Sequence, residues 1–193
     1  MIQYKKYYMP GTKEELLKTI DTIDCTYDIL AGGTDLYAKE KTPFNGADAA
    51  IDISGIKEFS VIKLKKEEGL ITFGSNICIQ QFLEEKVLME NVPILRHAAI
   101  YFADQQIREM ATVGGNVANS SPSGDTIAPL TALEAVIHTI TSKDNKICEK
   151  ETPITEFITG VGKNLLEKGE VISSITCPVL KEYGCAFQKV GLS

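Results

Sequence analysis

Two glycine pairs constrain this chain more than any other feature of its sequence. The first lies within residues 29–36 (ILAGGTDL), and the second lies within residues 111–125 (ATVGGNVANSSPSGD). Because glycine has no Cβ, the backbone N–H groups of such segments can approach a negatively charged oxygen closely. Two such segments in one chain predict a ligand with two phosphates that is held from both sides, as a dinucleotide would be.

Bulk properties narrow the class of ligand and the cell compartment. The chain has 193 residues, enough for one large domain or two small ones, and its net charge of −6 disfavours nucleic acid as a partner. No apolar run approaches the roughly 20 residues that span a bilayer, and residues 1–10 lack the core of a signal peptide. We therefore expect a small-molecule ligand and a cytoplasmic location.

The cysteine pattern argues against a metal centre. The five cysteines are widely spaced, no Cys-x-x-Cys pair occurs, and only two histidines could add ligands. Structural zinc sites and iron–sulfur clusters need closely spaced thiolates. The sequence therefore predicts five reduced thiols and no bound metal.

The first 55 residues have the pattern of a compact β-α-β-α-β unit. Strands are predicted over residues 4–9, 28–31 and 50–53, with helices over 12–23 and 36–41 between them. Thr12 is the expected N-cap of the first helix, and Glu15 is its capping-box partner. The first glycine pair then forms the turn between the second strand and the second helix.

Residues 56–180 have a mixed pattern and are expected to form a second subdomain. Predicted here are a hairpin over 59–74, helices over 79–85, 94–102 and 125–133, a hairpin over 135–148, a helical turn at 154–157 and a strand over 171–177. The first of these helices begins at 79–85 and is interrupted at Val92-Pro93, after which 94–102 continues as helix. Residues 185–190 are predicted to begin a further strand, so that 181–193 would start a region that continues beyond the chain. The expected fold class is α+β.

Each glycine segment also has a purely structural interpretation. The first matches neither a Walker motif nor a Gly-x-Gly-x-x-Gly fingerprint, so it could be only a tight turn. In the second, the Thr112 hydroxyl, the Gly114 and Gly115 N–H groups and the Asn116 amide could satisfy phosphate oxygens without a lysine. The alternative is a polar Ω-type loop in which Asp125 caps the next helix.

Other residues near the second segment also have two interpretations. Arg108 could bind phosphate or form a structural ion pair, and Tyr101-Phe102 could stack on a flat ring or fill the core. The sequence shows no Ser-His-Asp or Cys-His arrangement. Any chemistry is therefore expected to come from a cofactor.

Taken together, these segments resemble a known family, the FAD-binding subunit of molybdenum hydroxylases, which includes subunits of xanthine dehydrogenase, CO dehydrogenase and nicotinate dehydrogenase. The matching segments are AGGTDL (31–36), QIR (106–108), ATVGGN (111–116), SPSGD (121–125) and FQK (187–189). Their order and spacing fit as well, and the likeness covers essentially the whole chain.

The resemblance implies a two-subdomain fold of the vanillyl-alcohol-oxidase (PCMH) type, with FAD between residues 1–55 and 56–180. It implies contacts to the pyrophosphate and adenosine side, the sugar hydroxyls, the adenine and the isoalloxazine ring, but no catalytic residue and no metal ligand. The residues implied for the pyrophosphate and adenosine side are Ile29, Leu30, Ala31, Gly32, Gly33, Thr34, Asp35 and Leu36, with Ala111, Thr112, Gly115 and Asn116 from the second segment; those for the other groups are Asp125 (sugar hydroxyls), Phe102 and Ala103 (adenine), and Ile172 and Lys189 (isoalloxazine).

The same resemblance implies partners. A molybdopterin-binding large subunit and a small subunit with two-iron two-sulfur clusters would supply electrons to FAD, and these would pass to NAD or another acceptor. Family members continue into a C-terminal domain, which this chain would lack. The branch with an inserted four-iron cluster is excluded by the cysteine pattern.

Two other functions remain open at the level of sequence. One is a shortened, cofactor-free scaffold or interaction module of the same fold. The other is a self-contained flavin reductase such as UDP-N-acetylenolpyruvoylglucosamine reductase, but that would need a substrate domain and a serine–glutamate pair that the sequence does not display.

Overall fold

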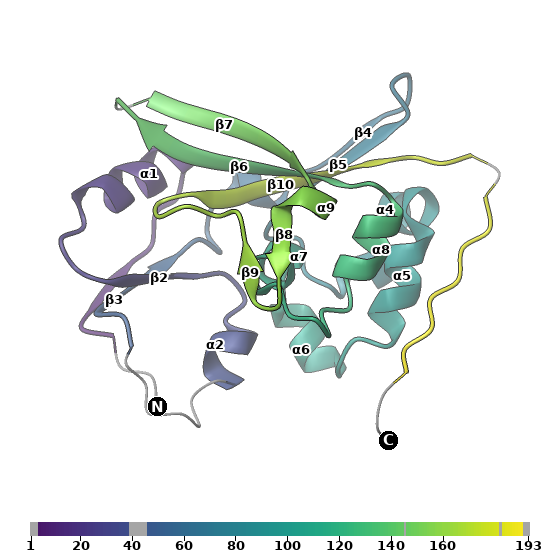
Figure 1. The fold of residues 1–193 in the computed structure, drawn as a ribbon, viewed down its shortest axis with the longest axis horizontal. Coiled ribbons are helices and arrows are strands. Elements are labelled where there is room, and N and C mark those ends of the chain that lie inside the picture. Colours follow the sequence, from purple (N-terminus) through teal and green to yellow (C-terminus); the bar gives the residue numbers. More distant parts are fainter. Residues whose placement is uncertain (1–3, 39–45, 145, 182, 191–193) are drawn as a thin grey trace.

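Two β-sheets, one parallel and one antiparallel, organise this chain (Figure 1). The computed structural model describes residues 4–38, 46–144, 146–181 and 183–190. In Figure 1 the larger sheet crosses the top of the molecule, the smaller sheet lies below one end of it, and most helices lie below the other end.

The smaller sheet is the expected β-α-β-α-β unit. Its strands are β1 (Lys6–Tyr8), β2 (Tyr27–Leu30) and β3 (Ala49–Asp52), which pair in parallel in the order β1-β3-β2. The connecting helices are α1 (Lys13–Thr22) and α2 (Thr34–Ala38). The secondary-structure prediction for this part is therefore confirmed, except that residues 39–41 of the second predicted helix lie outside the described residues.

The start of α1 shows how local sequence sets this geometry. The Thr12 side chain accepts a hydrogen bond from the Glu15 N–H group at 3.1 Å, as expected for an N-cap. The Glu15 carboxylate in turn accepts from the Gly11 N–H group at 2.7 Å. The reciprocal bond thus falls one residue earlier than in a standard capping box, on Gly11 instead of Thr12.

The larger sheet is antiparallel throughout. Its strands are β4 (Ile62–Lys65), β5 (Leu70–Gly74), β6 (Val136–Lys143), β7 (Lys146–Pro153) and β10 (Val171–Pro178), in the order β4-β5-β10-β6-β7. A 3₁₀ turn, η2 (Lys57–Ser60), precedes β4, at the point where the sequence predicted the strand to begin. A small hairpin of β8 (Ile158–Gly160) and β9 (Lys163–Asn164) was not predicted.

The helices of the second part cover one face of this sheet (Figure 1). Pro93 stands at the first position of its helix, where its missing N–H group costs no hydrogen bond, and it separates two helices as predicted. The helices are α3 (Gln81–Glu84), α4 (Lys86–Asn91), α5 (Pro93–Ile100), α6 (Gln105–Met110), α7 (Val113–Asn119), α8 (Ile127–Ala132) and α9 (Ile154–Phe157).

Two hydrophobic clusters form the core, and one of them joins the two sheets. The larger cluster lies between the antiparallel sheet and the helices of the second part. The smaller contains Leu16 of α1 and Ile51 of β3, but also Ile140 of β6 and Val171 of β10. Because residues of both sheets are buried in this second cluster, apolar packing fixes the parallel sheet against the antiparallel one.

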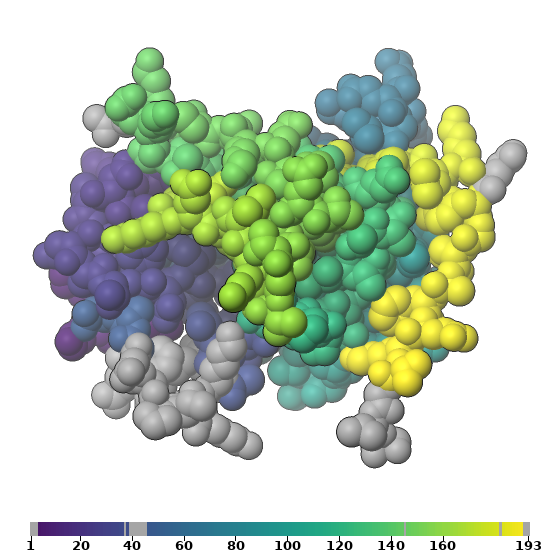
Figure 2. Space-filling model, viewed as in Figure 1, coloured from purple at the N-terminus to yellow at the C-terminus, as the bar shows by residue number. Residues whose placement is uncertain are grey.

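Two sequence predictions are wrong here. The second glycine pair, for which the sequence predicted no helix and offered an Ω-type loop as the alternative, lies in the first turn of α7, whose C-cap Ser120 has a left-handed φ of 49°. Residues 185–190 do not form a strand, and in the described structure they pair with no other strand. Instead, this C-terminal segment runs along the surface beside α5, as Figure 2 shows in yellow.

Candidate functional site

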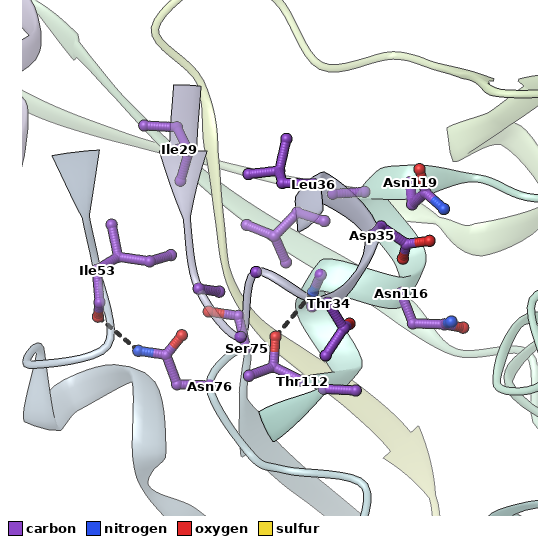
Figure 3. A pocket seen from close by; sticks show the side chains of 18 of the residues that line it. Ile29, Thr34, Asp35, Leu36, Ile53, Ser75, Asn76, Thr112, Asn116 and Asn119 are labelled. Atoms are coloured by element: carbon purple, nitrogen blue, oxygen red, sulfur yellow. Dashed lines mark hydrogen bonds between the residues drawn. The ribbon is translucent and has the colours of Figure 1, made fainter. Parts of the chain in front are cut away.

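A cavity of about 280 Å³ lies where the two glycine pairs meet (Figure 3). Its volume is near the lower end of the range for small-molecule sites. The parallel sheet contributes the ends of β2 and β3, and the second part contributes the segment after β5, helix α7 and the start of β10. The site therefore exists only because both parts of the chain pack together.

The first glycine pair forms the turn between β2 and α2. A Cβ at Gly32 would lie 1.8 Å from the Met110 carbonyl oxygen, so only glycine allows this turn to pack against the end of α6. Gly33 has φ 70°, a left-handed conformation that favours glycine. In the part of the chain that the structure describes, the N–H groups of Gly33 and Thr34 donate to no other backbone group, so they are available to a ligand.

The sequence suggested that the N–H groups of the second glycine pair bind phosphate, but in the structure they form hydrogen bonds within the protein. Gly114 N–H donates to the Ser75 carbonyl at 2.9 Å, and Gly115 N–H donates to the Thr112 side chain at 3.1 Å. Both groups thus already have partners within the protein, because Thr112 is the N-cap of α7. A ligand oxygen would have to share these N–H groups or displace the Thr112 hydroxyl.

Asn116, which follows the second glycine pair in α7, offers a side-chain donor in place of these backbone N–H groups. Its Oδ1 accepts from the Thr126 hydroxyl at 2.6 Å, which orients the amide. The Nδ2 group has no partner among the described residues, and Asn116 lines the cavity. Asn116 therefore keeps the ligand-binding capacity predicted for it, through its side chain.

The opposite wall comes from the antiparallel sheet. Strand β10 changes register between Ile172 and Ser174, and such bulges redirect side chains beside binding sites. Ile172 lines the cavity, as does Phe102, which follows α5. Glu170, which accepts a hydrogen bond from the Thr139 hydroxyl, closes the edge of the wall.

Most of the residues predicted from the sequence line this cavity. Those that do are Ile29, Ala31, Gly32, Gly33, Thr34, Asp35, Leu36, Phe102, Ala111, Thr112, Gly115, Asn116 and Ile172. Four predicted residues lie outside the lining, namely Leu30, Ala103, Asp125 and Lys189. Leu30 follows Ile29 on β2, so its side chain points to the other face of the sheet.

Asp125 and Lys189 are paired with each other. The Lys189 ammonium lies 2.8 Å from the Asp125 carboxylate and also donates to the Tyr101 carbonyl at 3.4 Å. Phe187 contacts the Tyr101 ring, with 6.2 Å between the ring centroids. The two predicted ligand residues are thus brought together by tertiary structure, beside the cavity and not in its wall.

Several lining residues were missed in the sequence. Ser75 and Asn76 could have been found from their position directly after a buried strand, because sheet ends present polar groups to ligands. The other missed residues have no comparable signal in the sequence. The missed residues are Ile53, Ser75, Asn76, Gly114 (expected only as an N–H donor), Ala118, Asn119, Leu166, Glu170 and Val171.

Arg108 forms hydrogen bonds within the protein and, among the described residues, no ion pair. Its guanidinium donates to the carbonyls of Phe102 and Ala103 at 3.0 and 3.1 Å and to Gln80 Oε1 at 2.9 Å. It therefore ties the turn after α5 to the start of α3. In this position Arg108 holds the turn that carries Phe102, which lines the cavity, and Arg108 itself is not in the lining.

The chemistry of the cavity suits a flat, oxygen-rich organic ligand. Among the described residues no lysine or arginine lines it, and its charged side chains are Asp35 and Glu170. Cys78 forms an isolated β-bridge with Thr112, and burial raises the pKa of its thiol above the usual value. Apolar walls for rings, free backbone N–H groups and neutral polar side chains match the parts of a dinucleotide.

The described residues show no metal site and no membrane span. Within residues 4–38, 46–144, 146–181 and 183–190, no group of three or more His, Cys, Asp or Glu side chains could hold a metal ion. In the same part of the chain, no helix is both long and apolar enough to cross a bilayer.

Comparisons with known proteins agree with the geometry. Residues 2–180 match the family described as the FAD binding domain in molybdopterin dehydrogenase. The glyceraldehyde dehydrogenase medium chain of Sulfolobus acidocaldarius is 28% identical over 184 residues, which are 95% of this chain and 63% of that protein. The nicotinate dehydrogenase FAD-subunit of Eubacterium barkeri is 29% identical over 88% of this chain and 57% of its own length.

A solved structure extends the likeness to the fold. Carbon monoxide dehydrogenase from Hydrogenophaga pseudoflava superposes with a TM-score of 0.85 at 26% identity, over 94% of this chain and 62% of the matched chain. This chain thus shares its mixed fold of helices and sheets with the matched chain of that structure. The present chain spans less than two thirds of the length of each relative.

Proposed function

The chain belongs to the family of FAD-binding domains in molybdopterin dehydrogenases, and from this premise we propose that it is the FAD-binding electron-transfer subunit of a molybdenum-containing hydroxylase or dehydrogenase of the xanthine dehydrogenase type. FAD is the cofactor of the family. The observation that carries the proposal is that both glycine segments line the same cavity.

The cavity accounts for the central part of the cofactor. We assign the pyrophosphate to the turn at Gly33 and Thr34, where backbone N–H groups are available, and to the amide of Asn116. Phe102 is suited to the adenine and Ile172 to the isoalloxazine ring, because both present apolar surface to the cavity. Bound FAD supplies two-electron and one-electron redox chemistry.

An extended dinucleotide is too long for a cavity of about 280 Å³, so part of it must lie beyond the enclosed volume. We propose that one end runs past Ala103 and Asn116 toward the Asp125–Lys189 pair. Asn116, which lines the cavity, is hydrogen-bonded to Thr126, the neighbour of Asp125, so the ion pair lies close to this end of the cavity. There Asp125 would accept from sugar hydroxyls of the adenosine half. Lys189, which is bonded to the Tyr101 carbonyl beside Phe102, would then lie on the adenine side of the cofactor and not at the isoalloxazine ring that the resemblance implied for it.

The wider assembly follows from the relatives. We propose that residues 1–55 and 56–180 are the two subdomains of a PCMH-type fold, and that a molybdopterin-binding large subunit and a two-iron two-sulfur small subunit are the partners. Electrons would arrive from the small subunit and leave to NAD or another acceptor. The five unpaired cysteines agree with a reducing, cytoplasmic location.

The test is the absorption spectrum of the purified protein, followed by heat release and identification of the flavin. We expect flavin bands, with FAD as the released compound. A cavity-filling variant, Ala118→Trp, should lose the bands, because Ala118 lines the cavity from α7. The matched control is Ala132→Trp, an exposed alanine on α8 that does not line the cavity.

Three outcomes decide the proposal. Flavin bound by the wild type and the control, but not by Ala118→Trp, supports the assigned site. If all three proteins bind flavin equally, FAD binds at a site other than this cavity. A colourless, folded protein that takes up no added FAD would contradict the proposal and favour the cofactor-free scaffold.

A further inference from the structure

Two adjacent side chains at the cavity wall carry oxygens that the protein leaves unsatisfied. Ser75 is 3% exposed and Asn76 is 7% exposed, and both line the cavity. Among the residues that the structure describes, Ser75 Oγ and Asn76 Oδ1 have no hydrogen-bond partner. Buried polar groups are nearly always paired, so two neighbouring exceptions at one cavity need an explanation.

The backbone holds both residues firmly in this position. The Ser75 N–H group donates to the Ser173 carbonyl at 3.0 Å, and its carbonyl accepts from Gly114 at 2.9 Å. The Asn76 N–H group donates to the Phe59 carbonyl at 2.8 Å. The two side chains are therefore placed by strand and helix contacts that do not depend on their own oxygens.

The orientation of the Asn76 amide is also determined. Its Nδ2 group donates to the Ile53 carbonyl at 2.6 Å, and a carbonyl can accept only from the nitrogen end of an amide. Figure 3 shows the nitrogen directed at Ile53 and the oxygen turned away from it, on the side of Ser75. Oδ1 is consequently an acceptor with a fixed direction.

The chemistry of the two oxygens selects the ligand group. Oδ1 can only accept, whereas the Ser75 hydroxyl can donate and accept. An ionised phosphate has no proton to give to Oδ1, but a hydroxyl can donate to Asn76 and accept from Ser75. In FAD, sugar hydroxyls flank the pyrophosphate on both sides. The Ser75 carbonyl accepts a hydrogen bond from the Gly114 N–H group, so Ser75 lies next to the second glycine pair, where such a hydroxyl is expected.

We propose that Ser75 and Asn76 bind one sugar hydroxyl of FAD, from either the ribose or the ribityl chain; this inference rests on the proposed function. The pair is a specificity device for the dinucleotide, since a ligand without this hydroxyl leaves two buried oxygens unsatisfied. Both residues are positioned by the fold before the ligand arrives, so little ordering accompanies binding.

The primary test uses Ser75→Ala, with FAD and FAD analogues that each lack one ribose or ribityl hydroxyl. Dissociation constants come from quenching of flavin fluorescence. Ser75→Ala should bind FAD on the order of tenfold more weakly. One deoxy analogue should bind wild type and Ser75→Ala equally, which identifies the hydroxyl that the pair contacts.

The melting temperature of the ligand-free protein separates binding from structure. Because the Ser75 hydroxyl has no partner among the described residues, Ser75→Ala should leave this temperature unchanged or raise it. The matched control is Ser173→Ala, which removes a hydroxyl that is 6% exposed, donates to the His138 carbonyl at 3.2 Å and does not line the cavity. That variant should melt earlier and bind FAD normally.

Asn76→Ala is a second, independent test of whether Ser75 and Asn76 bind a sugar hydroxyl. It should melt earlier, since it loses the bond to Ile53, and it should also lose the preference for FAD over the informative deoxy analogue. If Ser75→Ala and Asn76→Ala keep wild-type affinity for FAD and wild-type preference for every hydroxyl, the inference is overturned and the proposed function stands. If the wild type binds no FAD, both are overturned together.

Discussion

Gly32 illustrates how one missing side chain sets the geometry of this site. A Cβ there would lie 1.8 Å from the Met110 carbonyl oxygen and 2.6 Å from its carbon, which are backbone atoms that cannot turn aside. The first glycine segment therefore packs directly on the end of α6. The sequence suggested that glycine was needed for contact with a ligand, whereas at Gly32 it is needed for contact between two parts of the protein.

Gly32→Ala should consequently destabilise the fold itself. Overpacking of this kind costs about 1–3 kcal/mol, which lowers the melting temperature by roughly 2–12 °C in a protein of this size. The control is Gly184→Ala, because nothing lies within 4 Å of a Cβ at Gly184 and its φ is not positive. Equal melting temperatures for the two variants would contradict the close packing of the turn on α6.

At the scale of elements, the C-terminal segment is attached by few contacts. Residues 183–190 form no strand with the described residues, and they lie on the surface beside α5 (Figure 2). Lys189 bonds to Asp125 and to the Tyr101 carbonyl, and Phe187 contacts the Tyr101 ring. With the Cys185 Sγ–His97 Nδ1 contact at 3.8 Å, these few side-chain interactions hold a segment that the proposal places beside the cofactor.

Lys189→Met should release this segment without unfolding the protein. A partly exposed ion pair contributes at most about 1 kcal/mol, so global stability should change little. Chymotrypsin, which does not cut at lysine, should cleave at Phe187 or Tyr183 faster than in the wild type. Lys181→Met is the control, since Lys181 forms no ion pair with the described residues. Unchanged cleavage would show that the ion pair does not hold the segment.

For the whole molecule, the buried core sets a dependence of stability on pH. Cys177 lies in β10 within the larger hydrophobic cluster and is fully buried. Burial raises the pKa of its thiol from 9.0 to about 12. Above pH 9 the thiol of the unfolded chain loses its proton while that of the folded chain keeps it, so the folded state is destabilised as the pH rises from about 9 to 12.

The free energy of unfolding should therefore fall more steeply in the wild type than in Cys177→Ala. Between pH 8 and pH 10 the wild type should lose about 1.4 kcal/mol more of its free energy of unfolding than Cys177→Ala does. This is the free energy that corresponds to one pH unit above the pKa of the thiol in the unfolded chain. Urea unfolding at the two pH values measures it, and comparison with Cys177→Ala removes the contributions of all other groups. Parallel curves for the two proteins would mean that the thiol ionises normally in the folded state.

Local patterns predicted much of this structure, and tertiary contacts decided the remainder. The N-cap at Thr12 and the break at Pro93 depend on neighbours within a few residues, and both were predictable. Helix α7 was missed because two glycines and two asparagines disfavour helix, but the Ser75 carbonyl and the Thr112 cap stabilise its first turn.

The sequence by itself determined the parallel β-α-β-α-β unit, the alternation of elements after it and the two glycine segments that meet at the cavity. These depend on local propensity and on residue types that tolerate close approach. Only the tertiary structure decided that the N–H groups of Gly114 and Gly115 donate to atoms of the protein. It also decided that Asp125 pairs with Lys189 and that Ser75 and Asn76 line the cavity. Those outcomes depend on which distant atoms lie within hydrogen-bond reach, and that is set by the packing of the two sheets.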